Sequence, residues 1–270
     1  MDNQLKELHA TLQEILDYTV EVCEKNKLTY FLAYGSALGA YRHKGFIPWD
    51  DDLDIAMPRE DYNKLIEIMN KNPSDLYVIQ NEDNEDGYFL PFAKVRKKNT
   101  IFLESATEHR FQENGVFLDI FPLDYAEEKD SLKIKWTSLL ISYKRHALSF
   151  ISCKQVYRRK LGLLRYIVDY CLCAPVTIIG KKRVLKSLHL NAKSNGSPAS
   201  PYVVQYDQVT EKAFLKREVY FPAQKMEFES KFYNVPNKIC EYLSSQYGDD
   251  YMQLPPVEKR QNHNPAQLKL

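Results

Sequence analysis

Residues 31–57 carry the sequence FLAYGSALGAYRHKGFIPWDDDLDIAM, in which an apolar run, a small-residue turn and an acidic cluster follow one another. Residues 29–34 are rich in β-forming types and stop at Gly35-Ser36, as a strand does before a turn. A brief helix is expected over 37–42, and Pro48 prevents it from continuing. The stretch therefore predicts a strand, a turn and a helix ahead of the acidic cluster.

The acidic cluster ends in residues 52–56, where polar and apolar types alternate as in a half-buried strand. Side chains two apart on a strand share a face, so Asp52 and Asp54 are expected to project together. Like charges at that separation raise each other's pKa unless a cation lies between them, and their oxygens suit Mg²⁺ or Mn²⁺. The alternative is a solvated acidic turn over residues 50–52.

The Gly35-Ser36 turn precedes a helix, whose first backbone amides have no partner within the helix and can hold phosphate oxygens. A phosphate cradle followed by two facing carboxylates suits a diphosphate bridged by a metal ion. Arg42, His43 and Lys44 lie between the two, where one of them is expected to bind the diphosphate. Taken alone, such a Gly-Ser pair is usually only a turn.

Asp119 lies within GVFLDIFPLD, residues 115–124, which is otherwise an apolar strand. A buried carboxylate without a partner is costly, so Asp119 is a candidate third metal ligand or general base. The alternative is a core aspartate bonded to backbone amides. Asp124 is expected to be a turn or cap residue, and His189 to face solvent.

Lys94 and Arg96 alternate with Ala93 and Val95 and should leave one face of a strand. Both cations are candidates for contact with donor phosphates, and solvated strand charges are the alternative. Further strands are expected at 77–80, 100–103 and 116–121. The first half of the chain is thus predicted to be a mixed α/β unit.

The whole chain has 270 residues, of which 44% are hydrophobic and 27% are charged. This length and composition predict one globular domain, or one with a sizeable insertion, and argue against an integral membrane protein. Residues 1–16 have the pattern of an amphipathic helix rather than a cleaved leader, so a cytoplasmic location is expected. The five cysteines are odd in number and scattered, which favours reduced thiols.

Residues 131–200 contain fourteen Lys and Arg residues and one acid, Asp169, which gives this segment a charge of +13. Helices are expected over 131–190. The apolar run 161–180 is interrupted by Arg165, Asp169 and Pro175, so it is a poor membrane span but can lie at an anionic membrane surface. We expect three parts: a catalytic core at 1–130, this basic helical insertion at 131–200, and the rest of the catalytic domain at 201–270.

The stretch 31–57 closely resembles the signature of the LicD family of phosphocholine transferases, to which the fukutin-type ribitol-phosphate transferases are similar. The resemblance continues in residues 92–96 and 115–124, in Phe228-Glu229 and in YGDDYMQLPP at 247–256. Most of the chain outside the basic insertion is covered.

The resemblance implies an α/β (α+β) fold of nucleotidyltransferase type, a divalent metal ion (Mg²⁺ or Mn²⁺), and a CDP-activated donor from which CMP is released. Gly35 and Ser36 correspond to its phosphate turn. The implied catalytic and metal-binding carboxylates are Asp52, Asp54 and Asp119, and the candidate substrate-binding residues are Gly35, Ser36, Arg42, Lys44, Asp50, Lys94, Arg96 and Glu229.

The predicted reaction is transfer of phosphocholine, or a similar phospho-alcohol, from CDP-choline or a related donor to a sugar hydroxyl of a cell-surface glycan precursor such as teichoic acid or lipopolysaccharide. A lipid-linked acceptor would fit peripheral attachment of the basic insertion to the inner face of the membrane. Two alternatives stay open: transfer of the nucleotide itself to the acceptor, and a non-catalytic adaptor that binds membranes or polyanions. No nucleic-acid partner is expected, because the basic segment lacks an aromatic stacking module.

Overall fold

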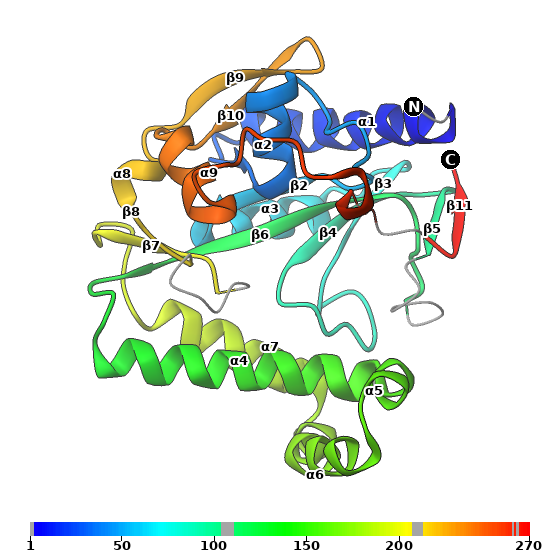
Figure 1. The fold of residues 1–270 in the computed structure, drawn as a ribbon, viewed down its shortest axis with the longest axis vertical. Coiled ribbons are helices and arrows are strands. Elements are labelled where there is room, and N and C mark those ends of the chain that lie inside the picture. Colours follow the sequence, from blue (N-terminus) through cyan, green and yellow to red (C-terminus); the bar gives the residue numbers. More distant parts are fainter. Residues whose placement is uncertain (1–2, 104–110, 207–212, 261, 263–264) are drawn as a thin grey trace.

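The computed structural model of the chain describes residues 3–103, 111–206, 213–260, 262 and 265–270 (Figure 1). Its longer helices are α1 (Asn3–Lys25), α2 (Tyr34–His43), α3 (Arg59–Lys71), α4 (Leu132–Ser152), α5 (Lys154–Lys160), α6 (Leu163–Ile179), α7 (Lys181–Lys193) and α9 (Ile239–Tyr247). Two short helices are α8 (Arg217–Tyr220) and the 3-10 turn η2 (Val257–Lys259). The strands are β1 (Phe31–Leu32), β2 (Asp54–Pro58), β3 (Tyr77–Gln80), β4 (Ala93–Lys97), β5 (Ile101–Leu103), β6 (Phe117–Ala126), β7 (Tyr202–Val204), β8 (Phe214–Lys216), β9 (Gln224–Phe228), β10 (Lys231–Val235) and β11 (Gln267–Lys269).

The main sheet is mixed, with strands in the order β1-β2-β6-β4-β3 and with β7 and β8 continuing from the far end of β6. Strands β2 and β6 are parallel, whereas β6 pairs antiparallel with both β4 and β7. Every residue of β6 is buried, as expected for a central strand covered on both sides. Helices α1 and α3 both contact β6 and help to cover it (Figure 1). The predicted α/β fold class is confirmed.

Helix α1 packs through the stripe that its sequence predicts, with Leu8, Leu12, Ile15 and Leu16 almost fully buried. The hairpin of β9 and β10 closes the same end of the molecule (Figure 1). Together these elements belong to one cluster of buried apolar residues that surrounds the main sheet.

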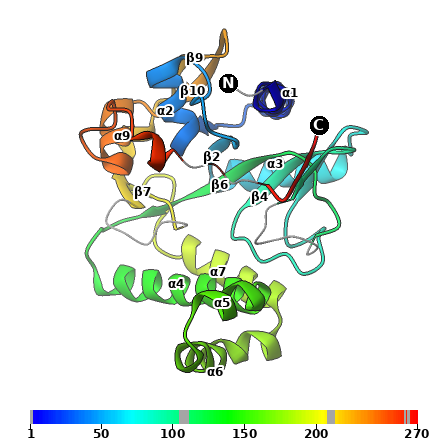
Figure 2. The ribbon, with the colours of Figure 1, turned by 45° about the vertical axis from the view of Figure 1, so that its right-hand side comes forward.

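The segment after β6 is helical, as predicted, and α4 to α7 lie together below the main sheet (Figure 2). Buried residues such as Leu148, Phe150 and Leu185 place these helices in a second apolar cluster. In the described part of the chain, no single helix is long and apolar enough to cross a membrane, although α6 and α7 together pass that test with a bend of 96° between them. The division at about residues 130 and 200 stays a prediction, which the two clusters support.

Two of the element boundaries that differ from the sequence prediction lie beside the candidate site. Helix α2 starts at Tyr34, so Gly35 and Ser36 belong to its first turn instead of preceding it. Strand β2 starts at Asp54, which leaves Asp52 just outside the strand. The reason is that its partner β1 is short: the amide of Ala33 still bonds to the carbonyl of Asp54, at 3.0 Å, and the chain then turns into α2.

Candidate active site

A cavity of about 640 Å³ lies where the start of α2, the segment 47–54 and the C-terminal segment 247–259 meet. Three of the predicted carboxylates line it, together with Gly35 and Arg42. The remaining lining residues are Tyr34, Leu38, Ile47, Trp49, Tyr247, Asp250, Tyr251, Gln253, Leu254, Pro255, Pro256 and Lys259. Lining residues from 34–54 and from 247–259 therefore form one site.

The first turn of α2 is tied to the start of β2 by Ser36. The Ser36 hydroxyl is buried and accepts a hydrogen bond of 2.8 Å from the backbone amide of Asp54. Gly35 lines the cavity beside Asp50, and a Cβ atom at Gly35 would come within 2.7 Å of the Asp50 Oδ2 atom. Ser36 thus orients the carboxylate-bearing strand, and Gly35 leaves room for a carboxylate.

Four carboxylates line the cavity: the predicted Asp50, Asp52 and Asp54, and Asp250 from the C-terminal segment. Asp54 is buried, and burial followed by the negative charges of Asp52, Asp119 and Asp50 raises its pKa well above the usual carboxyl value, while Lys94 opposes that rise. Several acidic groups held together at a partly desolvated position favour either a proton or a cation between them. Asp52 and Asp54 do face one cavity, as the sequence predicted.

A row of charged residues crosses three strands next to the cavity. Asp54 on β2 is the register partner of Asp119 on β6, which in turn is the partner of Lys94 on β4. The Lys94 Nζ atom lies 2.8 Å from the Asp119 Oδ1 atom and 3.4 Å from the centre of the Phe117 ring. The partner that Asp119 requires is therefore a buried lysine, and neither residue of this pair is among those that line the cavity.

Carboxylate oxygens are suitable ligands for a divalent cation, but the described side chains of the site do not form a complete ligand set for one. Within the described ranges, no three His, Cys, Asp or Glu side chains are grouped so as to hold a metal ion. Magnesium is commonly bound by one or two carboxylates together with substrate phosphates, and Asp52 and Asp54 fit that pattern. A metal ion held by these two residues stays a prediction, as does a third ligand at Asp119, whose Oδ1 atom forms an ion pair with Lys94.

Arg42 reaches across the cavity to the C-terminal segment. Its Nη1 atom donates to the carbonyl oxygen of Tyr251 at 2.8 Å and lies 3.4 Å from that of Gln253, while its Nε atom donates to His43 at 2.9 Å. Arg42 therefore holds one wall of the cavity, in addition to offering positive charge there.

Lys44 and Glu229 belong to the contact between α2 and the β9–β10 hairpin and do not line the cavity. Lys44 is exposed and lies 3.3 Å from Glu227. Glu229 accepts a hydrogen bond of 3.2 Å from the amide of Phe46 and covers Gly45, where a Cβ atom would meet its Oε1 atom at 2.2 Å. Lys44 and Glu229 therefore hold the loop that follows α2 against the β9–β10 hairpin.

Arg96 is fully buried and donates to Gln80 at 2.7 Å and to the carbonyl oxygen of Gly115 at 2.6 Å. These bonds tie β4 to β3 and to the start of β6, away from the cavity. Asp124 is also buried, and it receives two hydrogen bonds from the Arg59 guanidinium, so the prediction of a turn or cap residue was wrong. Both sets of hydrogen bonds join residues that are far apart in the sequence, so no local sequence pattern could have predicted them.

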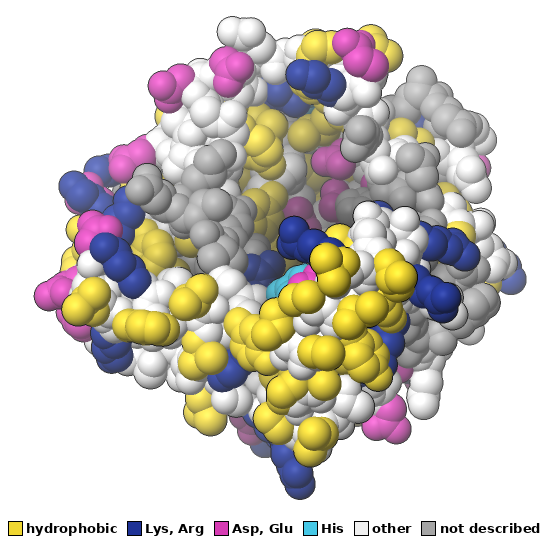
Figure 3. Space-filling view, turned by 60° about the horizontal axis from the view of Figure 1, so that its bottom comes forward, with side chains coloured by type: hydrophobic (Ala, Val, Ile, Leu, Met, Phe, Trp, Pro, Cys, Tyr) yellow, Lys and Arg dark blue, Asp and Glu magenta, His cyan; other side chains and the backbone are white. Residues whose placement is uncertain are grey.

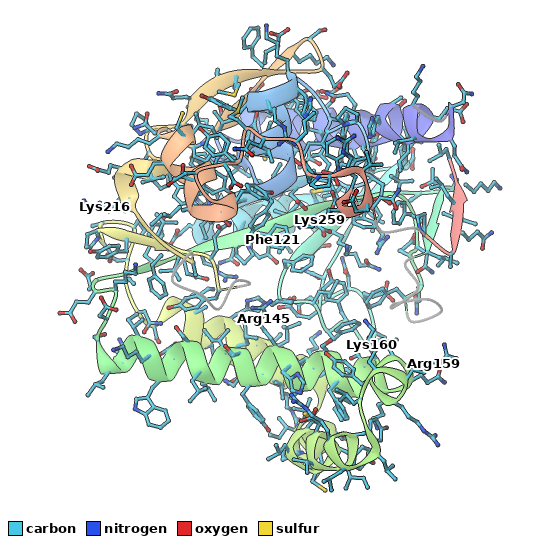
Figure 4. The ribbon with its side chains drawn as sticks, in the orientation of Figure 1. Phe121, Arg145, Arg159, Lys160, Lys216 and Lys259 are labelled. Carbon is cyan, nitrogen blue, oxygen red and sulfur yellow. The ribbon has the colours of Figure 1, made fainter. Side chains whose placement is uncertain are left out.

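Residues 247–259 form one wall of the cavity, and no individual residue of this segment was predicted to be a site residue. Tyr247, Tyr251 and Asp250 lie in the YGDDYMQLPP stretch that carried part of the resemblance, whereas Lys259 had no such signal. Lys259 and Phe121 of β6 lie on the side of the core that faces the helical insertion (Figure 4). The concentration of aromatic and acidic residues in 247–251 was the available hint of a binding surface.

Comparison with known proteins agrees with the motif resemblance. Residues 27–153 match the model of the LicD/FKTN/FKRP nucleotidyltransferase domain. The chain is similar to the lipopolysaccharide cholinephosphotransferase LicD of Haemophilus influenzae, with 27% identity and coverage of 96% of each chain. It is also similar to the human and mouse ribitol 5-phosphate transferase FKRP, with 46% identity over 50 residues that make up 18% of this chain and 10% of that protein. Residues 27–153 therefore match the domain that defines the LicD family, and the similarity to a LicD protein extends over nearly the whole chain.

Proposed function

We propose that the chain transfers phosphocholine from CDP-choline to a sugar hydroxyl of a cell-surface glycan precursor, such as a teichoic acid or lipopolysaccharide, and releases CMP. A LicD-type phospho-alcohol transferase is the general activity that the family supports. The observation that carries the finer proposal is the cavity itself, which joins a helix start, four carboxylates and an aromatic wall. The donor diphosphate would lie at the first turn of α2, where the backbone amides of Gly35 and Ser36 and the helix dipole favour phosphate.

The aromatic side chains of the cavity support choline as the transferred alcohol. Tyr34, Trp49, Tyr247 and Tyr251 line it together with Asp50 and Asp250. Aromatic faces beside carboxylates are the usual environment for a quaternary ammonium group. The Trp49 ring already receives a cation, because the Arg260 guanidinium lies 4.5 Å from its centre.

In the proposed step, the acceptor hydroxyl oxygen forms a bond to the phosphorus that bears choline, and the bond from that phosphorus to the bridging oxygen of CDP breaks. CMP leaves with the bond's electron pair, and the hydroxyl proton passes to a carboxylate of the cavity. A bound Mg²⁺ or Mn²⁺ would supply charge neutralisation for the diphosphate, with Asp52 and Asp54 as its ligands. Gly35 and Ser36 would position these groups, and the wall held by Arg42 would exclude water.

The test is incubation of the full chain with CDP-choline, Mg²⁺ and candidate glycans, followed by measurement of CMP and of the mass of the product. A phosphocholine increment on the glycan together with CMP supports the proposal. A nucleoside monophosphate increment would instead mean nucleotidyl transfer by the same site. Absence of turnover by the wild type, together with glycan or membrane binding that survives loss of Asp52 and Asp54, would mean a non-catalytic adaptor.

CDP-ribitol and CDP-ethanolamine serve as matched donors, because they present the same diphosphate with a different alcohol. Preference for CDP-choline that weakens in Trp49→Ala would support the aromatic wall as the choline subsite. Equal rates with all three donors would contradict that assignment while leaving the transferase activity intact.

A further inference from the structure

The outward face of α6 is apolar along its whole length. Leu163, Leu164 and Ile178 are 76%, 78% and 86% exposed. The further exposed apolar members of the stripe are Ile167, Val168, Leu172 and Ile179. The surface helix of a soluble domain normally turns polar residues outward and apolar residues inward. Helix α6 packs Cys173 and Val176 against its neighbours and turns its most hydrophobic residues outward.

Helix α4 adds a second exposed apolar stripe beside the first. Leu132, Trp136 and Leu139 are 76%, 70% and 60% exposed. The two stripes meet where the Tyr143 hydroxyl donates a hydrogen bond of 2.8 Å to the carbonyl oxygen of Leu172. Seen from below, the hydrophobic side chains gather into one broad area with Lys and Arg side chains at its edges (Figure 3). The face formed by α4 and α6 is therefore a continuous apolar surface.

The edge of this face is cationic. Arg158, Arg159 and Lys160 form the exposed last turn of α5, three residues before the α6 stripe begins. In the part of the chain that the structure describes, no carboxylate forms an ion pair with these three residues. Asp169, the single acid of residues 131–200, has only 13% of its side chain exposed and lies 3.8 Å from Arg165. The surface thus offers apolar side chains surrounded by positive charge.

This combination fits an anionic phospholipid surface better than a second copy of the chain. Apolar side chains enter the acyl boundary while Lys and Arg remain at the level of the phosphates. A symmetric dimer through the same face would bring the α5 cations of two copies together, which costs energy. We propose that the face formed by α4 and α6, with the basic end of α5, docks the protein on an anionic bilayer.

The geometry also relates the docked surface to the candidate active site. The hollow between the core and the helical insertion opens on the face that carries the apolar area, and acidic side chains lie at its floor (Figure 3). Arg145 projects from α4 into that gap, on the side facing Phe121 and the cavity residue Lys259, whereas Arg159 and Lys160 lie at the outer end of α5 (Figure 4). If the proposed function holds, a docked protein would therefore meet an acceptor carried by the bilayer.

Vesicle flotation of the full chain tests the docking proposal without donor or acceptor. We expect binding to phosphatidylcholine vesicles that contain about one third phosphatidylglycerol, and roughly tenfold weaker binding to pure phosphatidylcholine vesicles. The variant Leu164→Glu/Ile167→Glu should lose about tenfold or more of the binding to anionic vesicles. Arg158→Glu/Arg159→Glu should also lose binding, and raised salt should weaken binding of the wild type.

The matched control is Phe232→Glu, which changes an apolar residue of 65% exposure on the β9–β10 hairpin at the opposite end of the molecule. This variant should bind as the wild type does, and circular dichroism should show the same helix content in all variants. Equal binding by wild type and Leu164→Glu/Ile167→Glu would overturn the proposal, as would a wild-type dimer that this variant converts to a monomer. Failure of the proposed transferase would appear separately, as absence of CMP release with vesicle binding intact.

Discussion

Lys94 and Asp119 form a buried ion pair on neighbouring strands, with the Nζ and Oδ1 atoms 2.8 Å apart and the lysine almost fully shielded from solvent. Removing one member of such a pair leaves the other buried and uncompensated. The pair also lies beside Asp54, and its two members have opposite effects on the pKa of Asp54. Asp119 raises that pKa, and Lys94 lowers it. The ion pair therefore affects both the stability of the sheet and the protonation of Asp54 in the cavity.

Replacing Lys94 by Met should therefore lower the free energy of unfolding by about 3–5 kcal/mol, as measured by urea denaturation. Lys231→Met is the matched control, because Lys231 and Asp17 form an exposed pair at 2.7 Å that should contribute about 1 kcal/mol or less. The double variant Lys94→Met/Asp119→Leu should regain much of the loss. A Lys94→Met protein that unfolds at the wild-type urea concentration would contradict this account of the pair.

Asp52→Asn and Asp54→Asn should each lower the rate of CMP release by about a thousandfold or more, because the charge that would hold a divalent ion is lost. Far-ultraviolet circular dichroism should be unchanged. Asp83→Asn is a suitable control, since Asp83 pairs with Lys182 and Lys186 and does not line the cavity. Wild-type turnover in either cavity variant would remove that residue from the ligand set.

Gly35→Ala should impair turnover with little effect on folding, because the added Cβ would lie 2.7 Å from the Asp50 Oδ2 atom and displace that carboxylate. The end of a side chain moves at small energetic cost, so the melting temperature should change by only a few degrees. Gly162→Ala, where a Cβ meets no atom within 4 Å, should retain full activity. The role given to Gly35 would be refuted if Gly35→Ala turned over normally.

Arg42→Lys separates two roles of Arg42: its positive charge in the cavity and its hydrogen bonds to the C-terminal segment. Lysine keeps the positive charge but cannot reproduce the paired contacts with the Tyr251 and Gln253 carbonyls. We expect KM for the donor to rise by about tenfold and segment 249–256 to become more sensitive to proteolysis. Unchanged kinetics and proteolysis would indicate that Arg42 acts through its charge alone.

His189 should make the protein less stable in mild acid. Burial, followed by the positive charges of Arg59 and Lys193, lowers the pKa of His189 to about 3. The neutral form of His189 is thus favoured in the folded state. Its contribution to the free energy of unfolding is complete above the ordinary histidine pKa of about 6.5. That contribution is lost as the pH falls below this value, by up to about 1.4 kcal/mol per pH unit. His189→Gln should flatten the dependence of unfolding free energy on pH between about 5 and 7. An identical pH profile for wild type and variant would contradict this.

The local pattern of residues 31–57 predicted the order strand, helix, strand that the structure has in β1, α2 and β2. Alternation at 52–56 placed Asp52 and Asp54 on one side, and both line the cavity. The partners of Asp119, Arg96 and Asp124 could not be foreseen, because they depend on the register of strands and helices that are distant in sequence. The prediction that His189 faces solvent was wrong for the same reason, since Arg59 and Glu82 contact it from other elements. Residues 247–256 were marked by the resemblance, but nothing in the sequence indicated that they pack against α2 to form a wall of the cavity.

That wall has a consequence for biosynthesis. Domains begin to form as the polypeptide leaves the ribosome, and early segments fold first. Here, Tyr34 and Lys259 border the same cavity, so the central sheet can assemble long before the wall exists. Nascent chains and products of premature termination would therefore possess the acidic cluster without the surface that encloses it, and the ability to process a donor would arrive only after residues 247–259 have been translated.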